Sequence, residues 1–411
     1  MFETAIVVCP AAETPEASLL GVRVAGLPLV TRTLLTARQA GVERFVVVAS
    51  GPQQAGLRPQ IEGDDRLQGL VRWVDACGAP PISADSLLLL PTVLLEAGAL
   101  RRWLERAAGA GWLVAAEDGS GPLIVPAAHL SACIAAARDG ASGLAGYLAR
   151  VGDGGGLVRI SWDGAPQLPV RSDRDVPGVE GAMLAALGTP DDGPVLDRFV
   201  NRRVSGWLTR RLVRCRVSPN QVTGASLVTG LLGAWLLGGE GTLASLAGLL
   251  LFQLSVVLDH SDGELARLTF RFSRLGKWLD NFSDHAVGLA VIACMAWRVA
   301  AEGGAGRVAL LGILAAVGVT GSFLVVFWWT VAREGRTARA GAGGRRGLAS
   351  MANRDGFCLA LWATVLLGRP IWFLWALALG SNAYWMAWLL LRGLPGRKEG
   401  PEGARGDRGL V

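Results

Sequence analysis

Long apolar runs in the second half of the chain constrain the fold more than any other feature. From Gln221 onward the sequence is dominated by Leu, Val, Ala, Gly and Trp. A helix needs about 20 residues to cross roughly 30 Å of hydrocarbon, because it rises about 1.5 Å per residue. The runs predict six transmembrane helices that form an all-α bundle over residues 221–393. We expect the spans at residues 221–239, 243–268, 278–300, 308–332, 357–367 and 371–391, the fifth being the shortest.

Basic residues between the apolar runs predict the topology. The loop 333–354 carries six arginines, and the stretch 267–277 carries four basic residues. The turns at 239–241 and 301–307 are short or nearly uncharged. Because Lys and Arg concentrate on the cytosolic side of a membrane, we expect a multi-pass protein of the cell (inner) membrane. Both termini and the turn at 267–277 should then face the cytosol.

A basic segment precedes the first span, at residues 194–220. Val200, Val204, Trp207, Leu208 and Leu212 recur there at helical spacing, and seven arginines occupy the remaining surface. Such a pattern is typical of an amphipathic helix that lies in the membrane interface, with its apolar face in lipid. The alternative is a solvated surface helix.

The first half of the chain has the composition of a soluble α/β domain, which we place at residues 1–193. Short apolar segments at 4–9, 44–49, 70–74, 87–90 and 113–116 predict strands, and helical patterns at 30–40 and 99–108 alternate with them. This alternation is typical of a layered sheet covered by helices. The last residues, 394–411, form a predicted disordered basic tail.

Charge and cysteine content exclude several classes of function. The net charge of +6 comes from basic clusters that alternate with apolar runs. Neither aromatic interleaving nor a groove-reading motif accompanies these clusters, so we expect no nucleic-acid partner. Anionic lipid headgroups or phosphorylated substrates fit better. Six scattered cysteines without a CxxC pair, and three histidines, disfavour a disulfide framework or a zinc site.

Four aspartates lie between the second and third apolar runs. Asp259 and Asp262 are three residues apart, and Asp280 and Asp284 are four apart, so each pair shares one face of its helix. If the two helices are antiparallel neighbours, the four carboxylates can converge. Like charges this close raise one another's pKa unless cations neutralise them. The alternatives are carboxylates wetted at helix ends, or aspartates paired with Arg267, Arg271, Arg274 or Lys277.

Oxygen ligands without nearby His or Cys favour hard divalent cations. We expect Mg2+ or Mn2+ at this position, with two ions in all. The natural partner of such a site is a phosphate. Gly263 and Gly276 add small residues that let a ligand or another helix approach closely.

The complete pattern resembles the signature of the CDP-alcohol phosphotransferase family. It runs Asp259-x2-Asp262-Gly263-x2-Ala266-Arg267-x8-Gly276-x3-Asp280-x3-Asp284. All eight residue identities and all spacings agree with the signature. The preceding segment, Ser218 to Thr223, also resembles the one that opens the first membrane helix in that family.

The resemblance implies a reaction and a role for each matching residue. A CDP-alcohol and an acceptor alcohol would form a phosphodiester and release CMP. Asp259, Asp262 and Asp280 would hold the metals with help from Asp284, which would also be the catalytic general base. The residues lining the CDP pocket would be Gly263, Ala266, Arg267 and Gly276. The family also implies a homodimer.

The identities of donor and acceptor stay open. CDP-diacylglycerol is one candidate donor. Arg333, Arg336 and Arg339 could bind an acceptor that carries its own phosphate, such as inositol phosphate or glycerol phosphate. Topology and lipid-headgroup contacts explain these arginines equally well.

The first domain resembles a nucleotidyltransferase, but with departures at two positions. Where such enzymes carry a Gly-rich loop with Arg and Lys, residues 9–17 read Cys-Pro-Ala-Ala-Glu-Thr-Pro-Glu-Ala. A loop without glycine or cations is poorly suited to phosphate binding. Where a metal-binding Asp would follow the central strand, Pro91 and Thr92 stand instead. We therefore expect a degenerate, noncatalytic domain.

Two other classes of function compete with a phospholipid-synthesising transferase. A cation transporter could use carboxylates at membrane depth, and a lipid-binding scaffold could use the same helices without chemistry. The first leaves Gly263, Ala266 and Arg267 unexplained. The complete signature argues against the second.

Overall fold

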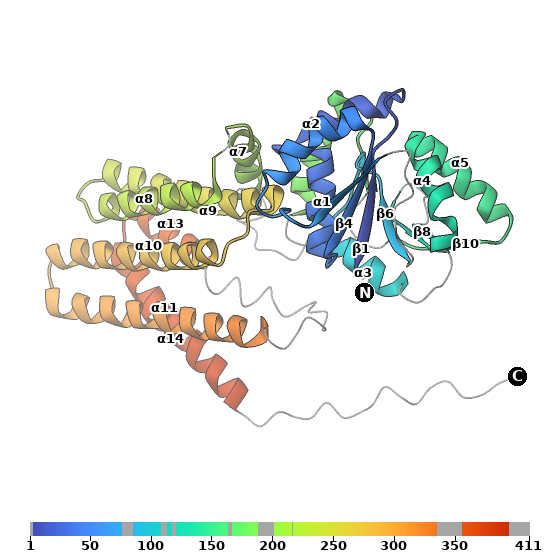
Figure 1. Cartoon of the computed structure of the whole chain (residues 1–411). Coiled ribbons are helices and arrows are strands. Elements are labelled where there is room, and N and C mark those ends of the chain that lie inside the picture. Colours follow the sequence, from blue (N-terminus) through green and yellow to red (C-terminus); the bar gives the residue numbers. More distant parts are fainter. Residues whose placement is uncertain are drawn as a thin grey trace, which may run out of the picture. The chain divides into compact units, whose positions relative to one another are not determined.

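The computed structural model describes residues 3–75, 85–107, 113–116, 121–162, 167–187, 201–215, 217–334 and 356–393. The chain divides into two compact units (Figure 1). One comprises Met1–Gly188, Arg210–Arg216 and Glu264–Arg271, and the other comprises Thr189–Thr209, Val217–Gly263 and Phe272–Val411. The first is an α/β unit and the second is helical.

A seven-stranded mixed sheet forms the centre of the α/β unit, in the order β10-β8-β9-β6-β1-β4-β5. β1 pairs in parallel with both β4 and β6, whereas β9 is antiparallel to β6 and β8. The strands are β1 (Thr4–Val8), β4 (Arg44–Ala49), β5 (Val71–Asp75), β6 (Ser86–Leu89), β8 (Leu113–Ala116), β9 (Leu123–Val125) and β10 (Leu157–Ile160). The five strands expected from the sequence are therefore confirmed, and β9 and β10 are additional.

The sheet is buried on both faces, because every residue after the first in β1, β4 and β6 is apolar and buried. Successive side chains of a strand point to opposite faces. Ala5 and Val7 of β1 accordingly join one hydrophobic cluster, while Ile6 and Val8 join another. Continuous apolar strands are typical of sheets covered by helices on both sides.

The first three helices of the unit cover one face of the sheet, and the next two cover the other face (Figure 1). The first cluster receives side chains from α1 (Leu29–Ala40), α2 (Gly51–Glu62) and α3 (Ala97–Ala107). The second receives them from α4 (Leu130–Arg138) and α5 (Gly140–Asp153). The smaller elements are β2 (Arg23–Val24), β3 (Leu27–Pro28), β7 (Val93–Leu94), β11 (Leu168–Pro169), α6 (Val176–Ala186) and the 3-10 turns Pro15–Gly21, Ala127–His129 and Asp173–Asp175.

The helical unit has a helix at each of the six predicted places. These helices are α8 (Pro219–Leu237), α9 (Thr242–Thr269), α10 (Arg274–Ala301), α11 (Ala305–Glu334), α13 (Gly356–Leu366) and α14 (Pro370–Gly393). In α9, α10, α11 and α14 a segment is long and apolar enough to cross a membrane. The shorter α13 has 11 residues, a length of about 16 Å. Within the described residues the chain thus has four candidate membrane spans, as expected of a membrane protein, and a bundle of six spans stays a prediction.

The surface of the helical unit is apolar as well as its core. Val291, Met295 and Phe373 are fully buried in the core. Large apolar side chains are nevertheless exposed, including Trp297 with 77% of its surface accessible. This distribution fits helices surrounded by lipid rather than by water.

Small residues bring two helices into backbone contact. A Cβ added to Gly233 of α8 would lie 2.9 Å from the carbonyl oxygen of Gly248 in α9. A Cβ added to Gly248 would lie 2.8 Å from the carbonyl oxygen of Gly233. Close packing through facing glycines is common in membrane helices. It sets α8 directly against the helix that carries Asp259 and Asp262.

The amphipathic segment forms α7 (Arg202–Arg214). Val204 and Trp207 are 44% and 56% exposed, as expected for an apolar face in lipid. The buried face instead carries three polar residues, Asn201, Ser205 and Thr209, at intervals of one helical turn, followed by Val213. Val200 lies outside the described residues. An interfacial position of α7 stays a prediction.

Candidate metal centre

The first half of the candidate site lies on α9. Asp259 and Asp262 are 8% and 5% exposed, respectively. The hydroxyl of Thr223, on α8, donates a hydrogen bond to Oδ2 of Asp262 at 2.5 Å. Thr223 is oriented by the start of α8, where Ser218 and Gln221 form a capping box. The segment from Ser218 to Thr223 was expected to open the first membrane helix, but the contact between Thr223 and Asp262 was not predicted.

The second half lies on α10. Ser273 caps this helix by accepting a hydrogen bond from the backbone N–H of Gly276 at 2.8 Å. Asp280 and Asp284 follow, one turn apart on the same side of the helix. Asp280 is half-buried and Asp284 is exposed.

Carboxylates from the two helices converge. One carboxylate oxygen from each of Asp259, Asp280 and Asp284 lies within 4.8 Å of the others. Asp280 is also in hydrogen-bonding contact with Asp259. Asp262 is close enough to Asp259 and Asp284 to interact with their charges. Three of the four predicted aspartates therefore meet, and Asp262 lies nearby with its carboxylate bonded to Thr223.

The cluster fits a divalent cation. One carboxylate oxygen from each of three residues lies close enough to the others for all three residues to share one divalent ion. Several carboxylates gathered among apolar helices are costly without positive charge. The donor set, carboxylate oxygens alone, suits Mg2+ or Mn2+.

The predicted CDP-binding positions lie on the same two helices. Gly263 and Ala266 are half-buried on α9, and Arg267 is exposed near its C-terminal end. Gly276 lies in the first turn of α10, where an added Cβ would be 2.8 Å from Ser273 Oγ and 3.0 Å from Asn220 Oδ1. The structure therefore gives a steric reason for glycine at this position. Arg333 lies in the last turn of α11, and Arg336 and Arg339 lie outside the described residues.

A cavity of about 450 Å³ adjoins Asp284 and extends among the helices. Its lining is mainly apolar, with hydroxyl groups from several serines. His285 lines it as well, stacked on Phe323 with ring centroids 4.6 Å apart, and its Nε2 is 3.3 Å from Thr320 Oγ1. Neither the cavity nor His285 was predicted. The one sequence signal for His285 was its position directly after Asp284. The cavity had no local signal, because it depends on helix packing.

An acidic side chain from the segment after β1 occupies the N-terminus of α5 in the α/β unit. Both oxygens of Glu16 accept hydrogen bonds from the backbone N–H of Ala141, at 3.1 and 3.2 Å. Ala141 lies in the first turn of α5, so a carboxylate occupies a helix N-terminus that could otherwise bind an anion. This contact agrees with the absence of glycine and basic residues from positions 9–17.

Comparison with known proteins bears on the helical unit. Residues 216–391 match the family model of the CDP-alcohol phosphatidyltransferases. The chain is 41% identical over 138 residues to the bifunctional IPC transferase and DIPP synthase of Thermococcus kodakarensis, a match covering 33% of this chain and 30% of that protein. It is 38% identical over 91 residues to the archaetidylinositol phosphate synthase of Aeropyrum pernix, covering 22% and 44%.

These matches span less than half the length of either relative. Among solved structures, the Mycobacterium tuberculosis phosphatidylinositol phosphate synthase with CDP-DAG bound aligns at 19% identity with a TM-score of 0.36. That alignment covers 51% of this chain and 100% of the other. The signature, the meeting of aspartates from α9 and α10 and the family match all concern one region. That region, residues 216–391, is similar to the CDP-alcohol phosphatidyltransferases.

Proposed function

We propose that the chain is an integral-membrane transferase of phospholipid synthesis. It would move a phosphatidyl or other phosphoalkyl group from a CDP-alcohol to an acceptor alcohol and release CMP. The observation that carries this proposal is the convergence of carboxylates from α9 and α10 beside a cavity. The family match over residues 216–391 supports it independently.

Asp259, Asp262, Asp280 and Asp284 would hold the metal. A divalent ion bound there would neutralise the diphosphate and make CMP a better leaving group. Thr223 would keep the Asp262 carboxylate in one orientation through its hydrogen bond. Gly263, Ala266, Arg267 and Gly276 would line the CDP pocket.

Asp284 would be the general base. It is the most exposed of the three carboxylates that meet, and it borders the cavity. Its carboxylate would accept the proton of the acceptor hydroxyl while the acceptor oxygen forms a bond to the phosphorus that bears the donor alcohol. The bond from that phosphorus to the CMP oxygen would break, and CMP would leave with the electron pair.

We propose an acceptor that carries a phosphate, with inositol phosphate first and glycerol phosphate second. The name of the Aeropyrum pernix relative, archaetidylinositol phosphate synthase, supports the first. Arg333, Arg336 and Arg339 would bind the acceptor phosphate. CDP-diacylglycerol is the proposed donor.

The α/β unit is proposed to be noncatalytic. The Glu16 carboxylate at the start of α5, and the lack of cations in residues 9–17, support this role. We further propose that this unit, the metal centre and the C-terminus face the cytosol, that the helical unit crosses the cell membrane six times, and that the protein is a homodimer.

A substrate panel tests the proposed function. Full-length protein in detergent, with Mg2+ and CDP-diacylglycerol, is given inositol phosphate, glycerol phosphate, inositol or serine in separate reactions. We expect CMP and a new lipid product with inositol phosphate, and neither after chelation of the metal. Absence of CMP with every acceptor would oppose the transferase proposal. Metal-dependent cation uptake into proteoliposomes would favour a transporter, and lipid binding alone would favour a scaffold.

A further inference from the structure

The last backbone carbonyl groups of α9 need hydrogen-bond donors from outside the helix. The last four carbonyl groups of an α-helix have no partner within the helix. Two are satisfied by the chain that follows: the N–H of Arg271 donates to Ala266 O at 3.0 Å, and the N–H of Phe270 donates to Arg267 O at 3.4 Å. These two bonds form a Schellman motif. The carbonyls of Leu268 and Thr269 need donors from elsewhere.

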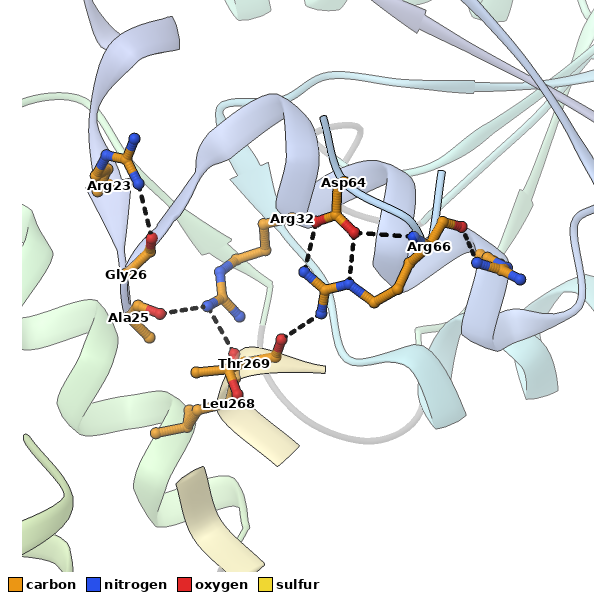
Figure 2. A network of polar contacts seen from close by, with 9 residues as sticks. Arg23, Ala25, Gly26, Arg32, Asp64, Arg66, Leu268 and Thr269 are labelled. Atoms are coloured by element: carbon orange, nitrogen blue, oxygen red, sulfur yellow. Dashed lines mark hydrogen bonds and ion pairs between the residues drawn. The ribbon is translucent and has the colours of Figure 1, made fainter. Parts of the chain in front are cut away.

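Two arginines of the α/β unit supply those donors, and Figure 2 shows both contacts. Nη2 of Arg32 donates to Leu268 O at 2.8 Å, and Nη1 of Arg66 donates to Thr269 O at 2.6 Å. All four terminal carbonyls of α9 therefore have donors. Two positive charges at a helix C-terminus also interact favourably with the helix dipole.

Arg66 is held in place by its neighbour Asp64. Nε and Nη2 of Arg66 donate to the two oxygens of Asp64 at 2.7 and 2.5 Å (Figure 2). A bidentate pair of this kind fixes the plane of the guanidinium. The remaining nitrogen, Nη1, is the one that binds Thr269 O. The ion pair thus orients a donor toward α9.

Arg32 is held by burial. It lies on α1 with 1% of its surface exposed, and it also donates to Val24 O in the β2–β3 hairpin at 2.8 Å. Burial lowers the pKa of Arg32 to about 10, so the group stays protonated at neutral pH. A buried charge is kept only where hydrogen bonds compensate it. Three of the compensating acceptors are the backbone carbonyls of Val24, Ala25 and Leu268.

Backbone strain accumulates around the Arg32 side chain. Among the described residues, Ala25 and Phe270 are the non-glycine residues with positive φ, at 47° and 55°. Ala25 O is 3.4 Å from Nη2 of Arg32, and the Phe270 ring centroid is 5.4 Å from the guanidinium carbon. Left-handed conformations of such residues persist where surrounding contacts hold them, and they concentrate at functional sites.

We infer that Arg32 and Arg66 are positioning residues, which hold the last turn of α9, with Ala266 and Arg267, in the conformation that binds the CDP group. This inference rests on the proposed function, because the CDP-binding role of Ala266 and Arg267 follows from the family resemblance. It gives the α/β unit a task other than nucleotide chemistry. A frayed helix end would displace Arg267 while leaving the aspartates, at least one turn earlier in α9, in place.

The test uses the full-length protein and two readouts. Arg66→Gln removes the donor to Thr269 at a side chain that is 26% exposed, so the fold should survive. Arg32→Met removes the donor to Leu268 O. Arg66→Lys keeps the positive charge at position 66 but offers one ammonium group in place of the guanidinium nitrogens. Arg58→Met is the matched control, because Arg58 lies over the Trp73 ring in the same unit. Amide hydrogen exchange over residues 266–271 measures how often the end of α9 opens. The Kd for CDP, measured by calorimetry, tests whether Ala266 and Arg267 are held in the binding conformation.

We expect both Arg66→Gln and Arg32→Met to speed exchange at residues 266–271 by about 10- to 100-fold. The Kd for CDP, and the KM for the CDP donor, should rise about tenfold while kcat changes less than twofold. Arg66→Lys should recover part of both effects, and Arg58→Met should show neither.

Unchanged exchange in Arg66→Gln would overturn the capping role. Faster exchange with an unchanged Kd for CDP would overturn the positioning role and leave an ordinary helix cap. Failure of the wild-type protein to release CMP under any condition would instead refute the proposed function. The exchange measurement would still decide whether the arginines hold the helix end.

Discussion

The hydrogen bond from Thr223 to Asp262 offers a sharp test of the proposed metal centre. Thr223→Val keeps the shape of the side chain but removes the hydroxyl that donates to Asp262 Oδ2 at 2.5 Å. Both residues are buried, so water is poorly placed to replace the donor. A hydrogen bond to a charged acceptor contributes about 1.5–3 kcal/mol. Groups that orient metal ligands change metal affinity by about 10- to 100-fold.

We therefore expect the Mg2+ concentration for half-maximal CMP release to rise by about 10- to 100-fold in Thr223→Val. At saturating Mg2+ the rate should recover to within a few-fold of wild type, because the proposed general base is untouched. The assay is CMP release as a function of Mg2+ concentration, in detergent, at fixed donor and acceptor.

Thr229→Val is the matched control on the same helix. The Thr229 hydroxyl bonds to Ala225 O in its own helix, and the side chain is not buried. Its Mg2+ dependence should equal that of wild type. An unchanged Mg2+ dependence in Thr223→Val would refute the view that this hydrogen bond orients a metal ligand.

Three further predictions follow from the same structure. Gly276→Ala should lower CMP release at least about tenfold without loss of folded protein, because the new Cβ would lie 2.8 Å from Ser273 Oγ and 3.0 Å from Asn220 Oδ1; wild-type activity would contradict the steric argument. Gly288→Leu should raise a substrate KM with little change in thermal stability, since Gly288 lines the cavity and an added Cβ meets nothing within 4 Å; unchanged KM values for donor and acceptor would exclude the cavity as a substrate site. Burial opposes ionisation of Asp64, but the hydrogen bonds from Arg66 outweigh it and lower the pKa of Asp64. Its ion pair therefore stabilises the fold fully above the unfolded pKa of about 3.9, and this stabilisation is lost as the pH falls through the lower folded pKa. Melting temperatures of wild type and Asp64→Asn should differ by a constant amount between pH 6 and 8, and should converge below about pH 4; a gap that persists at low pH would contradict this.

The helix positions could be predicted from the sequence because apolar runs and their interruptions are local features. The spacing of Asp259, Asp262, Asp280 and Asp284 likewise predicted which residues share a face. Strands β1, β4, β5, β6 and β8 were equally accessible from their apolar runs. β9 was missed because a three-residue strand carries too short a pattern, and β10 because Arg159 interrupts its apolar run.

The features that were missed depend on tertiary contacts. Thr223 contacts Asp262 because α8 packs on α9, and no local pattern reports that partner. Arg32 and Arg66 lie more than 200 residues before the carbonyls they bind, within segments that resemble ordinary helix and loop. The polar buried face of α7 was also unexpected, because residue spacing alone indicated its apolar face.

We propose that the aspartate cluster performs metal-dependent transfer with Asp284 as the base. The most direct measurement compares CMP release by wild type and Asp284→Asn at saturating Mg2+, with CDP-diacylglycerol and inositol phosphate, on protein shown to be folded and membrane-inserted. A positioned general base contributes about 10²- to 10⁴-fold to a rate. We predict a loss of at least 100-fold in Asp284→Asn with the helices intact. Turnover by Asp284→Asn at the wild-type rate would exclude Asp284 as the general base.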